Sequence, residues 1–131
     1  LLDAKDQSLI AACCLTPVEC PDTIQILFVA VDFPYQGKGY GQILMRNCED
    51  QIVKEGKKKI ILHAREPAVK FYLRLGYQLE YKSYLFLGQV QHYFFTKIPH
   101  QEPTDEQFVS NGLKLYQKLK NAEAEPAPTD C

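Results

Sequence analysis

The segment at residues 24–41 decides the fold, and it reads IQILFVAVDFPYQGKGYG. Residues 24–31 are almost continuously apolar and rich in β-branched side chains, which predicts a strand buried on both faces of a sheet. Pro34 lacks the backbone donor that a strand ladder needs, so the strand should end before it. Three alternating glycines follow at residues 36–41, and because glycine is costly in regular structure they predict a special backbone path.

A helical pattern follows the glycines and runs to Gly56, a plausible stop signal. A loop that leads into a helix N-terminus exposes unpaired N–H groups at the positive end of the helix dipole. The glycine loop therefore predicts an anion-binding site, and a tight turn between strand and helix is the alternative that spacing alone leaves open. The apolar face of the predicted helix carries Ile43, Leu44, Cys48, Gln51 and Ile52.

Short apolar runs predict further strands at residues 8–15, 60–62, 77–87 and 91–98. A second helix should open at Pro67 and close at Gly76, and a third is predicted at residues 104–120, capped by Thr104 with Gln107. The order of strands and helices indicates an α/β or α+β sheet. We therefore expect a main domain at residues 1–100, a C-terminal helix at 101–121 and a disordered tail at 122–131.

Composition narrows the classes of function. The chain has 131 residues and a formal net charge of −1, so it fits one domain without the basic excess of a nucleic-acid-binding protein. No apolar run approaches the roughly 20 residues that span a bilayer, so no membrane partner is expected. Five irregularly spaced cysteines without a CxxC pair predict reduced thiols, no metal site, and an intracellular, cytoplasmic location. Exposed sheet edges would favour a homodimer.

Two motifs that are separated in the sequence match specific patterns. Residues 36–41 match the pattern Gln/Arg-x-x-Gly-x-Gly/Ala, and Val29-Ala30-Val31 stands in the matching register ahead of it. Residues 68–77, AVKFYLRLGY, match Ala-x-x-x-Tyr-x-x-x-Gly-Phe/Tyr. Together these motifs resemble those of the GNAT superfamily of acyl-CoA-dependent N-acyltransferases. The resemblance covers roughly residues 8–97 and implies a mixed, mostly antiparallel central sheet flanked by helices, here with a shortened N-terminus and an extra C-terminal helix.

The resemblance also implies a function and a binding site. The implied reaction is transfer of an acetyl group from acetyl-CoA to a primary amine by direct attack, without a metal; the amine belongs to a small molecule or a protein. In this family the loop and helix start hold the pyrophosphate, and the strand before the loop pairs with the pantetheine arm. The residues expected to bind the cofactor are Val29, Ala30, Val31, Gln36, Gly37, Lys38, Gly39, Tyr40, Gly41, Gln42 and Arg65.

The catalytic expectations rest on four residues. Tyr72 corresponds to the family's general acid, which protonates the departing thiolate. Gln25 stands where some members have a glutamate base, and an amide cannot accept the proton. His92, in the last predicted strand, is the expected base because histidine titrates near neutrality, and His63 is a second candidate. A structural role for each of these rings is the alternative. A CoA-binding or regulatory module without turnover is the alternative function.

Overall fold

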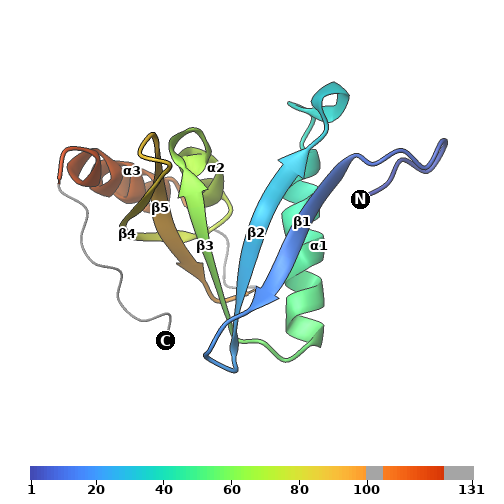
Figure 1. Cartoon of the computed structure of the whole chain (residues 1–131), viewed down its shortest axis with the longest axis horizontal. Helices are drawn as coiled ribbons and strands as arrows, with labels where there is room; N and C mark the ends of the chain where they lie inside the picture. The colour runs from blue at the N-terminus through green and yellow to red at the C-terminus, as the bar shows by residue number, and fades with distance from the viewer. Residues whose placement is uncertain (100–104, 123–131) are drawn as a thin grey trace.

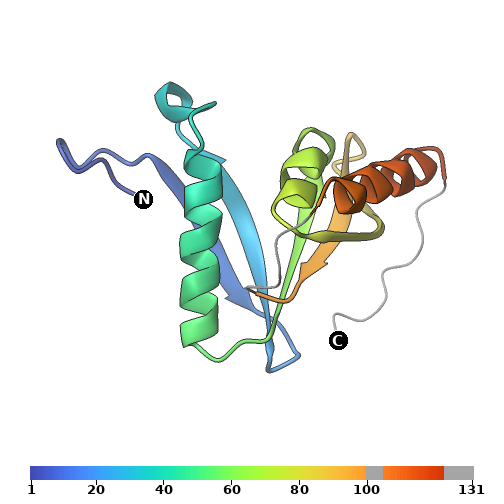
Figure 2. The ribbon, with the colours of Figure 1, turned by 180° about the vertical axis from the view of Figure 1, so that it is seen from behind.

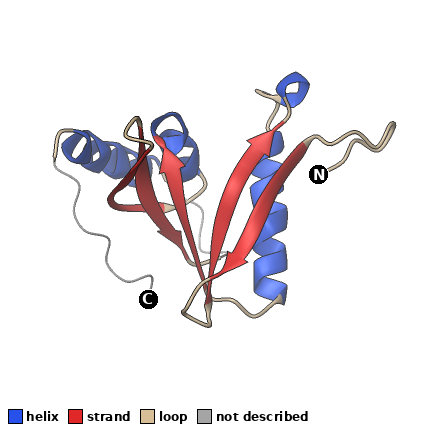
Figure 3. Cartoon of the chain, viewed as in Figure 1, coloured by secondary structure: helices blue, strands red, loops and turns tan. Residues whose placement is uncertain are grey.

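The computed structural model describes residues 1–99 and 105–122. Within these ranges the chain forms five strands, three α-helices and two single-turn 3-10 helices (Figure 3). The strands are β1 (Ala11–Pro17), β2 (Thr23–Val31), β3 (Lys59–Arg65), β4 (Gln78–Phe86) and β5 (Val90–Lys97). The helices are η1 (Phe33–Tyr35), α1 (Tyr40–Lys54), η2 (Glu66–Ala68), α2 (Val69–Arg74) and α3 (Glu106–Lys120).

The strands form one sheet in the order β1-β2-β3-β5-β4 (Figure 1). Strands β2 and β3 run parallel, connected through α1, whereas every other pair of neighbours is antiparallel. This arrangement confirms the predicted mixed, mostly antiparallel sheet. A parallel pair needs a long crossover connection, and α1 supplies it here.

Strand β2 separates from β3 partway along its length. The parallel pairing joins Thr23 through Gln25 to β3 and then stops, and Figure 1 shows the two strands diverging beyond that point. On its other edge β2 has a β-bulge, because Ala12 pairs with Ala30 but Cys14 pairs with Leu27. Phe28 lies in this bulge with a φ of 54°.

The predicted burial of β2 on both faces is therefore wrong for its second half. Phe28 is 80% exposed, and the side chains from residue 28 onward alternate between exposed and half-buried. The first half, Thr23 through Ile26, has the predicted burial, with only Gln25 half-buried. The separation leaves the backbone of the second half without a β3 neighbour, which a continuous apolar run of sequence does not reveal.

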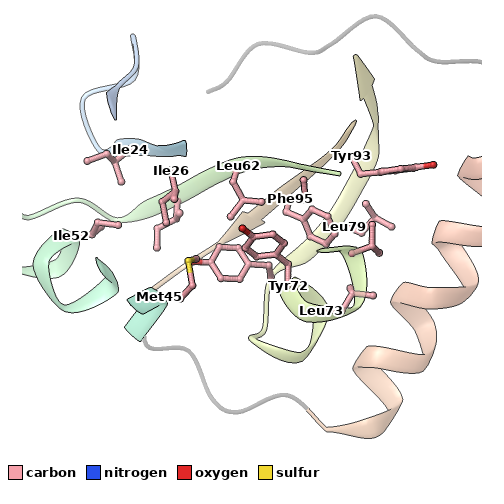
Figure 4. Close-up of a cluster of buried hydrophobic side chains, with 14 residues drawn as sticks. Ile24, Ile26, Met45, Ile52, Leu62, Tyr72, Leu73, Leu79, Tyr93 and Phe95 are labelled. Carbon is pink, nitrogen blue, oxygen red and sulfur yellow. The ribbon is translucent and has the colours of Figure 1, made fainter. Parts of the chain in front are cut away.

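All three α-helices lie on the same face of the sheet, as Figure 2 shows from behind. Helix α1 crosses β1 and β2, whereas α2 and α3 pack side by side over the other half. The core lies between these helices and the sheet (Figure 4). It is built by alternate strand residues and by the inner sides of the helices, including Ile24, Ile26, Met45, Ile52, Ile60, Leu62, Val69, Leu73, Tyr77, Leu79, Tyr93 and Phe95.

The buried side of α1 differs from the predicted one. Ile43 is 44% exposed and Gln51 is exposed, so these two assignments are wrong. Met45 and Glu49 are buried in their place, next to the correctly predicted Leu44, Cys48 and Ile52. The Glu49 carboxylate reaches the interior because the Lys97 ammonium lies 2.7 Å from it, a pairing that the sequence pattern does not show.

Helix α3 has the predicted extent with a different cap. Thr104 lies outside the described residues, and the Asp105 carboxylate accepts a 2.8 Å hydrogen bond from the backbone N–H of Phe108. The predicted apolar side, with Phe108, Leu115 and Leu119, packs against the main core. The tail predicted at residues 122–131 lies outside the described residues, apart from exposed Ala122.

The cysteines agree with prediction only in part. Cys13, Cys14 and Cys48 are free thiols, and the Sγ atoms of Cys13 and Cys48 lie 2.7 Å apart. That hydrogen bond lowers the pKa of Cys13 to about 7. Cys20 is disulfide-bonded, so the expectation that every thiol is reduced is wrong for this residue.

Candidate active site

Two pockets open where β2 separates from β3. The first, of about 580 Å³, is bounded by the glycine loop, the start of α1 and α2. The second, of about 560 Å³, lies over β2, β3 and the β4–β5 hairpin. Val29, Ala68 and Tyr72 line both pockets. The two pockets therefore adjoin at these three side chains.

The glycine loop gives the first pocket an anion-binding character. Gly37 and Gly39 have φ values of 76° and 84°, which few other residues adopt. Gly39 caps α1 without a side-chain hydrogen bond, and the first turn of the helix contains no acidic residue. The first N–H groups of α1 and the positive end of its dipole therefore face the pocket without a competing carboxylate.

The loop residues divide into those that build the loop and those that line the pocket. The Gln36 side-chain amide donates a 2.9 Å hydrogen bond to the Val31 carbonyl, which ties the loop to the end of β2. A Cβ on Gly41 would lie 3.3 Å from the Phe71 ring, so this glycine permits close packing of α1 against α2. Residues 36, 37 and 39–42 line the first pocket, whereas exposed Lys38 is not among its lining residues.

Tyr72 is held at the junction by the aromatic core. Its ring contacts those of Phe71, Tyr77 and Phe95 at centroid distances of 5.1 to 5.9 Å. The side chain is 6% exposed, and this burial raises the pKa of Tyr72 to about 12, with a smaller opposing effect of Arg65. The phenol is therefore protonated throughout the physiological range and can act as a proton donor.

Both predicted histidines line the second pocket. His92 Nδ1 lies 3.0 Å from the Val90 carbonyl oxygen, which can only accept, so Nδ1 carries the hydrogen. In the neutral ring, Nε2 is then free of hydrogen and can accept a proton. His63 Nδ1 lies 3.0 Å from the Ser83 hydroxyl, where either atom can donate. Of the two histidines, only His92 has its tautomer fixed by a partner that can only accept.

The structure places the predicted Arg65 in a different pocket and adds a second arginine to the site. Arg65, expected at the cofactor, lines the second pocket and is absent from the lining of the first. Arg74, the last residue of α2, lines the first pocket and was missed by sequence reasoning. Sequence reasoning had no signal for Arg74, because residues two positions apart on a helix do not share a face.

Gln25 lies away from the junction. It pairs with Ile61 in the parallel part of the sheet and lines neither pocket. Within residues 1–99 and 105–122, no group of three or more His, Cys, Asp or Glu residues could hold a metal ion. None of the helices formed by these same residues is both long and apolar enough to span a membrane.

The chain belongs to the acetyltransferase (GNAT) family, whose family model matches residues 1–77. No curated protein is significantly similar to it in sequence. The fold is nevertheless shared by solved structures of low sequence identity. The match to a proposed N-acetyltransferase from Lactobacillus plantarum has 21% identity and a TM-score of 0.66, and covers 72% of this chain and 63% of that one. The chain thus spans less than two thirds of that relative.

Two other similar structures contain the ligand that the motifs imply. An acetyltransferase from Bacillus subtilis in complex with CoA matches with 20% identity and a TM-score of 0.65, covering 72% of each chain. A GNAT family acetyltransferase from Elizabethkingia anophelis with acetyl-CoA bound matches with 16% identity and a TM-score of 0.66, covering 74% of this chain and 73% of that one. At these identities the likeness shows the fold.

Proposed function

We propose that this chain is an acyl-CoA-dependent N-acetyltransferase that transfers an acetyl group to a primary amine. The observation that carries the proposal is the pair of pockets that meet at Tyr72, one bounded by the glycine loop and the other by two histidines. Each reactant would occupy its own pocket, and the buried side chain of Tyr72 lies where the two pockets adjoin. Family membership and the CoA-bound relatives support the same activity.

The first pocket would hold the CoA moiety. The backbone N–H groups of the loop and of the first turn of α1 suit the pyrophosphate, and Lys38 and Arg74 can add charge at its rim. Contacts to a helix end contribute only about 0.3–2 kcal/mol each, whereas micromolar affinity needs about 8 kcal/mol. The unpaired edge of β2 from Val29 to Val31 is therefore needed too, to pair with the amides of the pantetheine arm.

Acetyl-CoA supplies an activated acetyl thioester to the junction. The amine nitrogen forms a bond to the acetyl carbon while the carbon–sulfur bond breaks. A backbone N–H of β2 near the bulge can stabilise the negative charge on the acetyl oxygen. The Tyr72 hydroxyl donates its proton to the departing sulfur, and His92 Nε2 takes the proton that the amine loses. The proton on His92 then returns to Tyr72 through solvent, which restores both groups.

The acceptor amine would enter through the second pocket. Arg65 and the two histidines there belong to this side of the reaction, so we assign Arg65 to the acceptor rather than to CoA. A homodimer and a cytoplasmic location stay predictions.

Product analysis tests this function. Purified chain with acetyl-CoA and a panel of primary amines should release free thiol and yield the acetylated amine by mass spectrometry. Binding of acetyl-CoA without turnover of any amine would instead support the alternative, a CoA-binding module. Absence of both binding and turnover in a folded chain would reject the proposal.

A further inference from the structure

The second pocket is bordered by a series of aromatic and imidazole rings that contact one another. The His63 ring lies 5.0 Å from Phe94 and 5.1 Å from Tyr84, measured between centroids. Tyr84 in turn stacks on His92 at 4.4 Å, with only 17° between the ring planes. Phe86 meets the edge of His92 at the outer end of the series. A wall of this kind favours a flat, unsaturated ligand, which can meet its rings by offset stacking or edge-to-face contact.

The formal charge of the side chains around this wall is positive. Among the described residues, the lining of the pocket contains Arg65, His63 and His92 and no aspartate or glutamate. The guanidinium of Arg65 forms no hydrogen bond or ion pair with any described residue. A cation that faces a ligand pocket without a protein partner is suited to an anionic group on the ligand.

Two carboxylates that lie close to the pocket residues in sequence have other partners. Glu66 follows Arg65 directly, but its Oε1 accepts a 3.3 Å hydrogen bond from the Tyr93 hydroxyl. Tyr93 belongs to the core between the helices and the sheet, so this carboxylate is bonded on the side of the sheet that the helices cover. The Glu80 Oε1 accepts a 2.7 Å hydrogen bond from the Thr96 hydroxyl, and neither residue lines the pocket. A second positive charge on the acceptor would therefore find no counterion there.

From these observations we propose the chemical class of the acceptor: a primary amine on a flat aromatic body that also carries a carboxylate. The ring body stacks on the wall formed by His63, Tyr84 and His92, and the carboxylate pairs with Arg65. The inference rests on the proposed N-acetyltransferase function and adds the choice of substrate. Polyamines and lysine-rich peptides are excluded from this class, because they bring further positive charge to a basic pocket.

Three amines test this choice during turnover. L-phenylalanine and phenethylamine differ only in the carboxylate, and spermidine provides an aliphatic polycation. We expect kcat/KM for L-phenylalanine to exceed that for phenethylamine about 10-fold and that for spermidine about 100-fold. Equal or better use of phenethylamine or spermidine would overturn the proposal.

A substitution at Arg65 makes the test specific to the carboxylate. In Arg65→Gln the ratio between L-phenylalanine and phenethylamine should fall from about 10 to about 1. The matched control is Lys82→Gln, because Lys82 hydrogen-bonds to the Lys120 and Ala122 carbonyls outside the pocket. This control removes the same charge and should preserve the ratio. An unchanged ratio in Arg65→Gln would remove Arg65 from substrate choice.

Binding without turnover separates this inference from the proposed function. NMR signals of the His63 and His92 rings should shift saturably with millimolar L-phenylalanine and not with spermidine. If acetyl-CoA binds and amines are acetylated but these signals do not respond to L-phenylalanine, the acceptor class is wrong and the function stands. If the rings respond but acetyl-CoA neither binds nor reacts, the N-acetyltransferase function fails while the pocket chemistry is supported. If the rings respond equally to both amines, the acceptor class is rejected.

Discussion

Tyr72 is the residue on which the proposed chemistry depends most. Its ring contacts three aromatic neighbours. Among the described residues, Tyr72 is the only one with a titratable side chain that lines both pockets. A nearby tyrosine, Tyr77, offers a comparison. Its buried hydroxyl has no hydrogen-bond partner among the residues that the structure describes, and the residue lines neither pocket.

Substitution of Tyr72 by phenylalanine should therefore impair the chemical step. General-acid catalysis typically contributes about 10²–10⁴-fold, so we expect kcat to fall at least about 100-fold in Tyr72→Phe while the Kd for acetyl-CoA stays within about 2-fold. Steady-state kinetics and calorimetry measure the two quantities. As the control, Tyr77→Phe should retain kcat and raise the free energy of unfolding by about 1 kcal/mol, because it removes an unpaired buried hydroxyl. Unimpaired turnover by Tyr72→Phe would refute its role as the acid.

The pKa of Tyr72 gives a further prediction at this scale. A free phenol has a pKa of about 10 and would be half deprotonated at pH 10. Burial raises the pKa of Tyr72 to about 12, so its acid form persists well above pH 10. At saturating amine, kcat should therefore show no decline between pH 8 and about pH 10.5. The raised pKa of Tyr72 would be contradicted by a loss of kcat centred near pH 9–10 that the residual rate of Tyr72→Phe does not show.

At the scale of elements, a buried ion pair connects α1 to the opposite half of the sheet. The Lys97 ammonium on β5 lies 2.7 Å from the Glu49 carboxylate on α1 and donates to the Leu75 carbonyl at the end of α2. It also lies 5.2 Å from the centre of the Tyr77 ring. One side chain thus holds together the two helices that border the first pocket.

Removing the Lys97 ammonium should be strongly destabilising. In Lys97→Met the buried Glu49 carboxylate loses its counterion, so we expect the free energy of unfolding to fall by about 3–5 kcal/mol. The double variant Lys97→Met/Glu49→Leu should recover most of that loss, because no charge is then left buried. Urea denaturation of the two variants and the wild type measures the difference. A double variant as unstable as the single one would show that the pair matters for another reason.

Sequence reasoning was most successful where local pattern decides the structure. The glycine loop, the extents of α1 and α3, and the positions of the later strands followed from glycine, proline and apolar periodicity. It failed where contacts between residues distant in sequence decide the structure. The burial of Glu49 depends on Lys97, the exposure of Phe28 depends on the bulge opposite Cys13, and the place of Arg65 depends on how far β2 stands from β3.

At the scale of the whole molecule, the separation of β2 from β3 organises both pockets. The helices cover one face of the sheet (Figure 2). The strand residues that alternate with His63 and His92 belong to the core under the helices, so these histidines lie on the uncovered face. A ligand paired with the free edge of β2 would pass between the strands and link the glycine loop on one side to the histidines on the other. The account therefore depends on binding of acyl-CoA at the glycine loop.

Calorimetric titration with acetyl-CoA tests that claim most directly, using two matched glycine variants. Gly39 at the start of α1 and Gly56 after its end both have a positive φ, of 84° and 77°, and a Cβ would contact nothing at either. Gly39→Asp adds a negative charge where the pyrophosphate is expected, whereas Gly56→Asp adds the same strain and charge at the far end of the helix. We predict micromolar binding by the wild type and by Gly56→Asp, and at least about a 10-fold loss in Gly39→Asp. Equal affinity in the two variants, or no binding by the folded wild type, would contradict the account.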